Sequence, residues 1–540
     1  TMNLPWMERL GNWNPQFLRE LKGQLKTRKL AIAIGVSLIG QFLLVMYLYE
    51  LLNLDGTYSS FCVRTSNYNC RLDAAGQIII DWQQWWQTIF SILNWILPLI
   101  LLLAGVYMII SDLGKEERRG TLNFIRLSPQ SSQSILTGKI LGVPILLYLG
   151  VGLALPLHCW SAISAGVPFH FLVSFYLLSG ASYYFFYSAA LLFGFLSGFQ
   201  AASTSFLTFV FAWPLLNVIN WSVSLVTQVN YDWKDSGLYY WQWFYIPLGS
   251  NFLLAETFAI LNFGLWTYWI WQALNRRFSN SNATLLSKKQ SYWIVACFEL
   301  LLLGFCLQNN HLNPAKYADS GSLWGVLSFI ETINLLWFLG LIAALSPHRQ
   351  ALQDWARYRR DNVSNRKGFW KSNLMQDLLW GEKSPLLVAI AVNLGIKTVI
   401  WGAWILSWPQ NTNKISAILG LIVSLNWILI LAGIVQTLLF MKTAKRSLWA
   451  GITVIALIVF PPAFFSVLSM PFYQSSGVWL LTAFPWIAVK EASATAIFLT
   501  ILGQWSVTAL LSLQLTRQMR LAGESSSKAI FANRPSLPTN

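Results

Sequence analysis

Charged residues and histidines are scarce in this sequence. Only 11% of the 540 residues are charged, against about 25% in a typical soluble domain, which excludes an ordinary soluble fold. The four histidines, His158, His170, His311 and His348, show neither metal-ligand spacing nor a partnered nucleophile. They are also too few for a protein that binds many haems, because histidine is a common axial ligand of haem iron. We therefore expect neither an enzyme active site nor a metal site in this chain.

A phosphate-binding loop of the form G-x-x-x-x-G-K-[ST] is also missing. Such a loop holds the phosphates of ATP and positions magnesium. The pair Gly138-Lys139 cannot serve, because Ile140 follows it and the earlier glycine is lacking. We expect no cofactor in this chain, so any ATP and magnesium that its function requires would be bound by a partner.

Apolar residues, by contrast, are abundant: they make up 55% of the chain and occur in long blocks. A helix of about 17–25 apolar residues crosses the roughly 30 Å of hydrocarbon in a bilayer. The sequence therefore predicts an all-α polytopic membrane protein with about twelve transmembrane helices, surrounded by lipid. The blocks lie near residues 30–52, 88–110, 136–157, 170–196, 202–224, 251–272, 292–308, 322–345, 385–407, 415–440, 447–469 and 493–515.

The net charge of +16 comes from basic residues in short loops between these blocks, rather than from one basic soluble face. This distribution argues against a nucleic-acid partner. If the N-terminus is inside, 30 of the 37 basic residues lie in inside segments, counting Lys139, and six lie outside. Such a bias predicts that both ends are cytoplasmic. We expect an integral protein of the inner or plasma membrane of a prokaryote, or of a related internal membrane.

A polar linker at residues 276–291 separates two sets of six blocks. We therefore expect a cytoplasmic amphipathic segment at 1–29, a first membrane domain at 30–275, a second at 292–515 and a cytoplasmic tail at 516–540. The triplet Leu-Ser-Pro occurs at 127–129 and again at 345–347, in comparable loops. A match of three residues leaves two alternatives open: the second half is a repeat of the first, or it is an appended membrane domain.

Residues 111–142 contain the most informative polar stretch. A charged segment leaves the second block, Gly120 interrupts it, and residues 121–127 form an amphipathic turn. This pattern predicts a short helix on the cytoplasmic membrane surface, with Ser128-Pro129 starting the next turn. The apolar anchors of this helix would be Leu122, Phe124, Ile125 and Leu127. The alternative is an ordinary solvated loop between two spans.

A second amphipathic pattern lies near the N-terminus, where apolar residues recur at helical spacing opposite a basic face. The apolar residues are Phe17, Leu18, Leu21 and Leu25, and the basic ones are Arg19, Lys22 and Lys26.

These two stretches resemble elements of one known family. The run Glu116-Glu117-Arg118-Arg119-Gly120-Thr121-Leu122, followed by Leu127-Ser128-Pro129 and Gly138-Lys139, resembles the coupling-helix region of ABC-2-type transporter permeases. The segment 14–22, followed by Arg28-Lys29, is similar to the amphipathic N-terminal connecting helix of that family. Six spans within residues 1–275 also fit, so the resemblance covers about half of the chain.

The resemblance implies an ABC-2-like six-helix N-terminal half and the function of a transmembrane permease subunit of an ATP-driven exporter. A separate ABC ATPase subunit would dock on the cytoplasmic face, and the permease would either dimerise or supply both halves of the pathway. The implied ATPase contacts are Glu116, Glu117, Arg118, Arg119, Gly120, Thr121, Leu122, Ser128 and Pro129. The implied connecting helix includes Phe17, Leu18, Arg19, Glu20 and Leu21. The rival functions are a secondary transporter and a non-transporting membrane scaffold.

Four charged residues fall within the apolar blocks: Glu256, Glu299, Glu331 and Lys397. Each costs about 2–4 kcal/mol if it lies centrally in the membrane, so such residues often form polar paths or ion pairs between helices. Alternatively, the three glutamates lie near span ends and reach the headgroups.

The first outer segment contains Cys62 and Cys70 on the predicted oxidising side of the membrane. The two residues either form a disulfide or remain free thiols.

Overall fold

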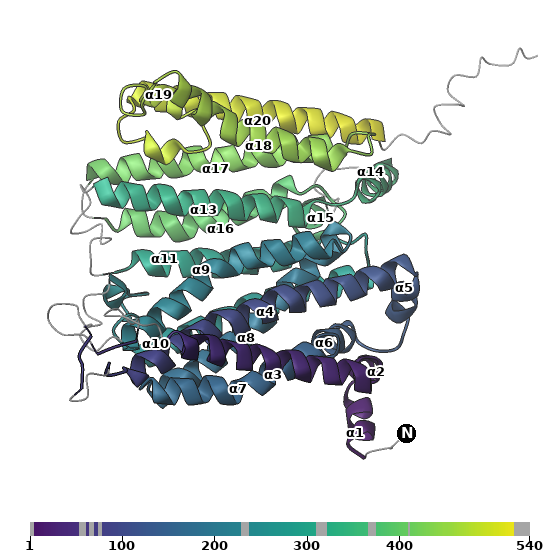
Figure 1. The fold of residues 1–540 in the computed structure, drawn as a ribbon. Helices are drawn as coiled ribbons and strands as arrows, with labels where there is room; N and C mark the ends of the chain where they lie inside the picture. Colours follow the sequence, from purple (N-terminus) through teal and green to yellow (C-terminus); the bar gives the residue numbers. More distant parts are fainter. Residues whose placement is uncertain are drawn as a thin grey trace, which may run out of the picture. The chain divides into compact units, whose positions relative to one another are not determined.

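A computed structural model describes residues 5–52, 61–63, 70–73, 78–227, 237–308, 321–364, 374–408 and 411–522. Within these ranges the chain is helical, and extended pairing is limited to three isolated bridges (Figure 1). Eleven of the described helices are long and apolar enough to cross a membrane. The chain is therefore an all-α polytopic membrane protein.

The chain divides into two compact units, with the main boundary between residues 281 and 282, inside the predicted linker. Unit 1 comprises residues 1–239 and 249–281. Its N-terminal helices are α1 (Pro5–Trp13) and α2 (Pro15–Gln24). Its long helices are α3 (Thr27–Glu50), α4 (Trp82–Arg118), α7 (Ile145–Ser164), α8 (Phe169–Ser197), α9 (Ala201–Thr227) and α10 (Phe252–Ser279). Its short elements are α5 (Thr121–Arg126) and α6 (Ser132–Gly142), and η2 (Gly237–Tyr240) lies at its boundary with unit 2.

Unit 2 comprises residues 240–248 and 282–540. Its long helices are α11 (Lys288–Cys306), α13 (Gly321–Leu345), α16 (Leu387–Leu406), α17 (Asn411–Leu439), α18 (Arg446–Val467) and α20 (Ala494–Ala522). Its other elements are α14 (Arg349–Ser364), α15 (Leu374–Trp380), α19 (Ser476–Trp479) and η4 (Pro485–Ile487). Of the predicted cytoplasmic tail at 516–540, residues 516–522 belong to α20, and the rest lies outside the described residues.

Two predicted spans differ from the structure. The prediction placed a single span at 136–157, but a turn at Val143 and Pro144 separates α6 from α7. Proline lacks the backbone N–H that a helix interior needs, which explains why the apolar block is interrupted there. The sixth predicted span corresponds to α10, which has 28 residues but is not among the eleven helices that are apolar enough. Glu256 and Asn262, together with several Trp and Tyr residues, lower its hydropathy.

Each unit has its own apolar core. In unit 1, α4 packs against α7, α8 and α9, and α8 packs against α10. The largest cluster of this unit extends from Val106 and Ile110 of α4 to Leu191 of α8 and Leu274 of α10. In unit 2, α17 packs against α13, α16, α18 and α20, and the main cluster is rich in tryptophan, with Trp401 among its buried members.

The two cysteines of the predicted outer segment are joined in the structure. Cys62 and Cys70 form a disulfide with a Cα–Cα distance of 5.4 Å, within the range that such bonds require. Isolated bridges connect Cys62 to Ile80 and Leu72 to Ile78, so the bond lies in a segment with some extended pairing.

Candidate functional site

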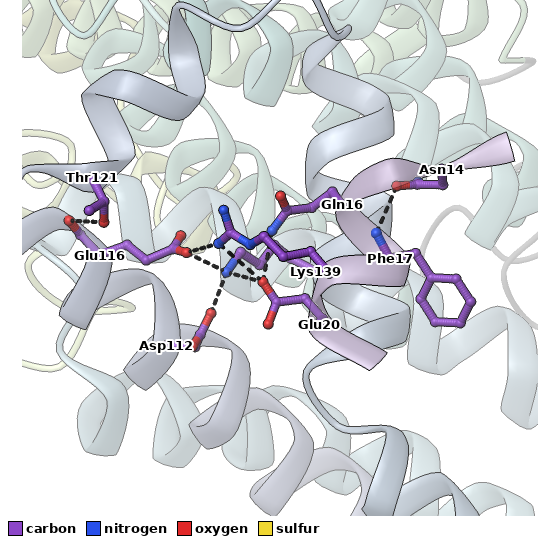
Figure 2. Close-up of polar contacts among 9 residues, drawn as sticks. Asn14, Gln16, Phe17, Glu20, Asp112, Glu116, Thr121 and Lys139 are labelled. Atoms are coloured by element: carbon purple, nitrogen blue, oxygen red, sulfur yellow. Dashed lines mark hydrogen bonds and ion pairs between the residues drawn. The ribbon is translucent and has the colours of Figure 1, made fainter. Parts of the chain in front are cut away.

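The candidate site lies where α2, α4 and α6 meet at one end of unit 1, the end that the charge distribution predicts to be cytoplasmic (Figure 2). Asn14 starts α2, because its side-chain oxygen accepts a hydrogen bond from the Phe17 N–H at 2.9 Å. This is the usual chemistry of an N-cap residue. The same side chain donates to the Ser134 carbonyl at 2.8 Å, which ties the beginning of α2 to α6.

Two glycines let α2 and α6 approach closely. A Cβ atom at Gly138 would lie 2.8 Å from the Asn14 Oδ1, and one at Gly142 would lie 2.5 Å from the Glu20 Cβ. Both distances are too short for real atoms, so any side chain at these positions would push α2 away. Small residues four positions apart commonly allow such close helix packing. Here they bring the side chains of α2 within reach of Lys139, which lies between them in the sequence.

Lys139 is the centre of the site. Its side chain is 1% exposed, and its Nζ lies 2.7 Å from Glu20, 2.5 Å from Asp112 and 2.8 Å from Glu116. The three carboxylates come from α2 and from the last turns of α4, so one ammonium group links three helices (Figure 2). A second cation, Arg19, lies 2.5 Å from the same oxygen of Glu116.

The charges of this cluster explain how a lysine can be buried there. Burial alone lowers the pKa of Lys139, but the neighbouring Asp112 and Glu20 carboxylates raise it more, so the net pKa lies above its usual value. The carboxylates of Glu20, Asp112 and Glu116 are close enough together to hold a metal ion. However, the Lys139 ammonium contacts all three, which makes the arrangement an ion-pair cluster rather than a cation site.

The cluster holds the end of α4, from which α5 projects. Gly120 separates the two helices in the left-handed conformation, with φ at 72°, which glycine adopts without the steric cost of a Cβ. Leu122 and Ile125 of α5 are buried in the core of unit 1. The Arg126 guanidinium lies over the rings of Phe195 and Phe278, at 5.9 and 5.7 Å from their centres. These contacts fix the orientation of α5.

The opposite side of α5 is open. Phe124 is 80% exposed and Leu127 is 85% exposed, so only two of the four predicted apolar anchors pack against the protein. Leu122 and Ile125 face the core while Phe124 and Leu127 point away from it, so the four residues do not share one protein surface, and anchoring of the helix on a membrane stays a prediction. Glu117 and Arg118 nearby are also exposed.

The predicted coupling residues divide into three groups. Glu116 lies inside the ion-pair cluster and Leu122 lies in the core, so neither offers its side chain to a partner. Five others lie on the exposed rim: Glu117, Arg118, Arg119, Gly120 and Thr121. Ser128 and Pro129 follow α5. The prediction that they start the next helical turn is wrong. That helix begins at Ser132, because the Ser131 side chain caps it by accepting the Ser134 N–H.

The predicted connecting helix is also present, but its buried face is more polar than the apolar stripe suggests. Gln16 and Glu20 are buried beside Leu21, whereas Phe17 and Leu18 are only half-buried. Gln16 donates to Glu20 at 2.7 Å, and Arg19 is largely exposed on the other side. The spacing of the apolar residues did not predict that these polar side chains point inward.

Sequence reasoning also missed the roles of Asn14, Asp112 and Lys139. The available signal was the Gly138-x-x-x-Gly142 spacing around a lysine, which indicates close packing of another helix against a buried charge.

The four charged residues predicted in the spans fall in two places. Glu256 lies near one end of its helix, four residues after the start of α10. Its carboxylate accepts a hydrogen bond from the Ser174 hydroxyl of α8. Glu299, Glu331 and Lys397 lie near the middle of three helices of unit 2. For Glu299 and Glu331, the alternative of a position near a span end is therefore wrong.

Compared with known proteins, the chain matches no family model, no curated protein and no solved structure.

Proposed function

We propose that this chain is the transmembrane permease subunit of an ATP-driven exporter similar to the ABC-2 type. A separate ABC ATPase would bind at the end of unit 1 that carries α5. The observation that carries the proposal is the Lys139 cluster, which fixes the amphipathic helix α2 to α4 and α6 beneath an exposed α5.

This arrangement suits the transmission of a mechanical stroke. A force applied to α5 acts directly on α4, a helix of 37 residues that extends into the core of unit 1. The same ion pairs carry the movement to α2 and α6. A solvated loop would absorb such a force, whereas buried contacts on Leu122 and Ile125 make α5 move with the bundle.

The exposed side of α5 supplies the partner surface. Phe124 and Leu127 form an apolar pair with charged neighbours, and solvent-exposed apolar groups of this kind often mark binding sites. An ATPase subunit would accept the pair in an apolar pocket, with acidic groups near Arg118 and Arg119. Magnesium and ATP would be bound entirely by that subunit.

The proposal is tested by purifying the full chain from its native membranes in mild detergent. We expect a soluble protein to co-purify and the eluate to hydrolyse ATP. The double variant Phe124→Ser/Leu127→Ser should yield the same amount of folded permease but lose both the partner and at least about 90% of the ATP hydrolysis, because two central apolar contacts are removed.

The matched control is Tyr358→Ser/Met375→Ser, which removes two similarly exposed apolar side chains, 63% and 65%, from α14 and α15 of unit 2. This control should retain the partner and its activity. Equal loss in both variants, or no ATP hydrolysis with the wild-type chain, would contradict the proposed docking site.

A secondary transporter remains the second candidate, and one observation favours it. Lys397 and Glu331 form an ion pair at 2.7 Å in the middle of their spans, a position where ion-coupling residues are found in secondary transporters. Substrate uptake or release by vesicles that contain the purified chain alone, driven by an ion gradient without ATP, would support this function over the first.

A further inference from the structure

Unit 2 buries two carboxylates and one ammonium group in the middle of its spans. Glu331 is ten residues from the beginning of α13 and fourteen from its end. Lys397 is ten residues from the beginning of α16 and nine from its end. Glu299 is eleven residues into α11, seven before its end. None of the three is close enough to a helix end to reach water easily.

Their contacts differ. The Lys397 Nζ lies 2.7 Å from the Glu331 Oε2, and the lysine side chain is 0% exposed. Glu299 is likewise 0% exposed, but its hydrogen-bond donors are neutral. The Trp401 Nε1 donates to it at 2.7 Å, and the Asn334 amide, with its nitrogen facing the carboxylate, donates at 3.0 Å.

The charges of this cluster do not balance. Lys397 and Glu331 neutralise each other, which among the residues that the structure describes leaves Glu299 without a cation of its own, although both charged neighbours lie close enough to interact with it electrostatically. An ionised carboxylate at the centre of a bilayer costs about 2–4 kcal/mol, and a second carboxylate nearby adds repulsion. A single proton removes both penalties.

Other titratable groups around α11 do not supply the missing charge. Cys306 is a buried thiol on the same helix. Asp377, from α15, lies at the opposite end of α11, near Lys288. Tyr245, from the segment 240–248, meets α11 at Leu307, beyond its last turn. The Asp377 carboxylate, the tyrosine and the thiol carry no positive charge.

A small cavity adjoins the ion pair. Its volume is about 20 Å³, which is enough for one water molecule. Glu331 lines it together with the polar residues Ser328, Thr332 and Ser424. A water molecule there would have several hydrogen-bonding partners. It could donate a proton to the neighbouring carboxylate or accept one from it.

We propose that Glu299, Glu331 and Lys397 form a binding site for one proton inside unit 2. The proton resides on Glu299, while Glu331 remains paired with Lys397. It exchanges by way of the water-sized cavity at Glu331, so the net charge of the cluster alternates between 0 and −1. This inference does not depend on the proposed ATPase partner, because it concerns only residues of unit 2.

The test is infrared spectroscopy of the purified full chain in lipid vesicles, which detects the carbonyl stretch of protonated carboxylic acids. At neutral pH the wild-type spectrum minus that of Glu299→Gln should contain one such band, and the band should disappear as the pH is raised. The control Glu117→Gln, which changes an exposed carboxylate, should give no band at neutral pH. Absence of the band from the Glu299→Gln difference spectrum at every pH would overturn the proposal.

Lys397 provides an independent variant. In Lys397→Gln the Glu331 carboxylate loses its cation, so the acid band should grow roughly twofold at neutral pH. Lys397→Arg keeps the charge and should leave the amplitude unchanged, which also covers the case in which the glutamine variant does not fold. Loss of the band when sodium chloride replaces choline chloride would show that the site binds a metal cation, and this too would overturn the proposal.

Discussion

The two units bury a lysine in different ways. In unit 1, Lys139 contacts three carboxylates on two other helices. In unit 2, Lys288 is almost as buried, but it donates to the Leu378 and Pro385 carbonyls at 2.7 and 3.0 Å and to the Ser384 hydroxyl at 2.6 Å. The Leu378 carbonyl lies in the last turn of α15, so Lys288 helps to cap that helix. A buried lysine can therefore either join several helices through ion pairs or cap the end of one helix.

The units also differ in where they keep their charges. Unit 1 concentrates its ion pairs at the end where α2, α4 and α6 meet. Unit 2 places the Glu331–Lys397 pair within its spans. This difference underlies our proposals of partner contact for the first unit and of proton binding for the second.

The largest effect should come from the two buried lysines. Lys139→Met leaves three neighbouring carboxylates without their central cation and should destabilise the protein by about 3–5 kcal/mol, the usual cost of breaking a buried ion pair. Lys288→Met removes hydrogen bonds to neutral acceptors only and should cost about 1–3 kcal/mol. Thermal unfolding of both variants in mild detergent measures the difference. Equal losses would mean that the two lysines play the same role.

The next effect concerns the disulfide of the predicted outer segment. Unit 1 carries the Cys62–Cys70 disulfide, whereas Cys306 of unit 2 is a buried thiol. Cys62→Ser/Cys70→Ser should lower stability by about 2–3 kcal/mol through the lost loop constraint. A reductant should lower the melting temperature of the wild type to that of the variant and leave the variant unaffected. A variant that still responds to reductant would point to another bond.

Close packing of α2 on α6 predicts a smaller loss. In Gly142→Ala the new Cβ would meet Glu20 at 2.5 Å, so α2 must shift, at a cost of about 1–3 kcal/mol. The control Gly152→Ala on α7 meets no atom within 4 Å and should be neutral or slightly stabilising. The melting temperatures of the two variants are compared with that of the wild type. An unchanged melting temperature in Gly142→Ala would show that α2 does not pack against α6.

The smallest expected effect is that of pH. Because the pKa of Lys139 is higher in the folded protein than in the unfolded chain, its contribution to stability is complete below pH about 10.5 and disappears as the pH rises through the folded value. The stability difference between wild type and Lys139→Met should therefore be constant from about pH 7 to 9 and shrink only in stronger alkali. A gap that narrows near neutral pH would contradict the ion-pair assignment.

The long helices could be predicted because their signal is local. A run of apolar residues long enough to cross a bilayer is visible in any single sequence, and nearly all predicted blocks became helices. The third span was misplaced at its beginning, since apolar composition does not distinguish α6 from α7 and only Pro144 marks the break. Pro144 ends the helix there although the residues on both sides are apolar.

The partners of charged residues could not be predicted. Lys139 and Glu20 are 119 positions apart, and Lys397 and Glu331 are 66 apart, so only the packing of helices brings them together. Hydropathy identified Lys397 as costly but could not name its partner. Hydropathy also did not predict that the Glu116 side chain is directed inward, although this residue belongs to a run that resembles an ATPase-contact motif.

The most direct test of the docking surface on α5 is a photo-crosslink from Phe124. Benzoylphenylalanine is placed at position 124 of the full chain, and in a parallel sample at Tyr358 of α14, and native membranes are irradiated. We expect position 124 to crosslink to a soluble subunit whose sequence contains a phosphate-binding loop, and position 358 to do so far less. Crosslinks from position 124 to lipid alone, or equal crosslinks from both positions, would contradict it.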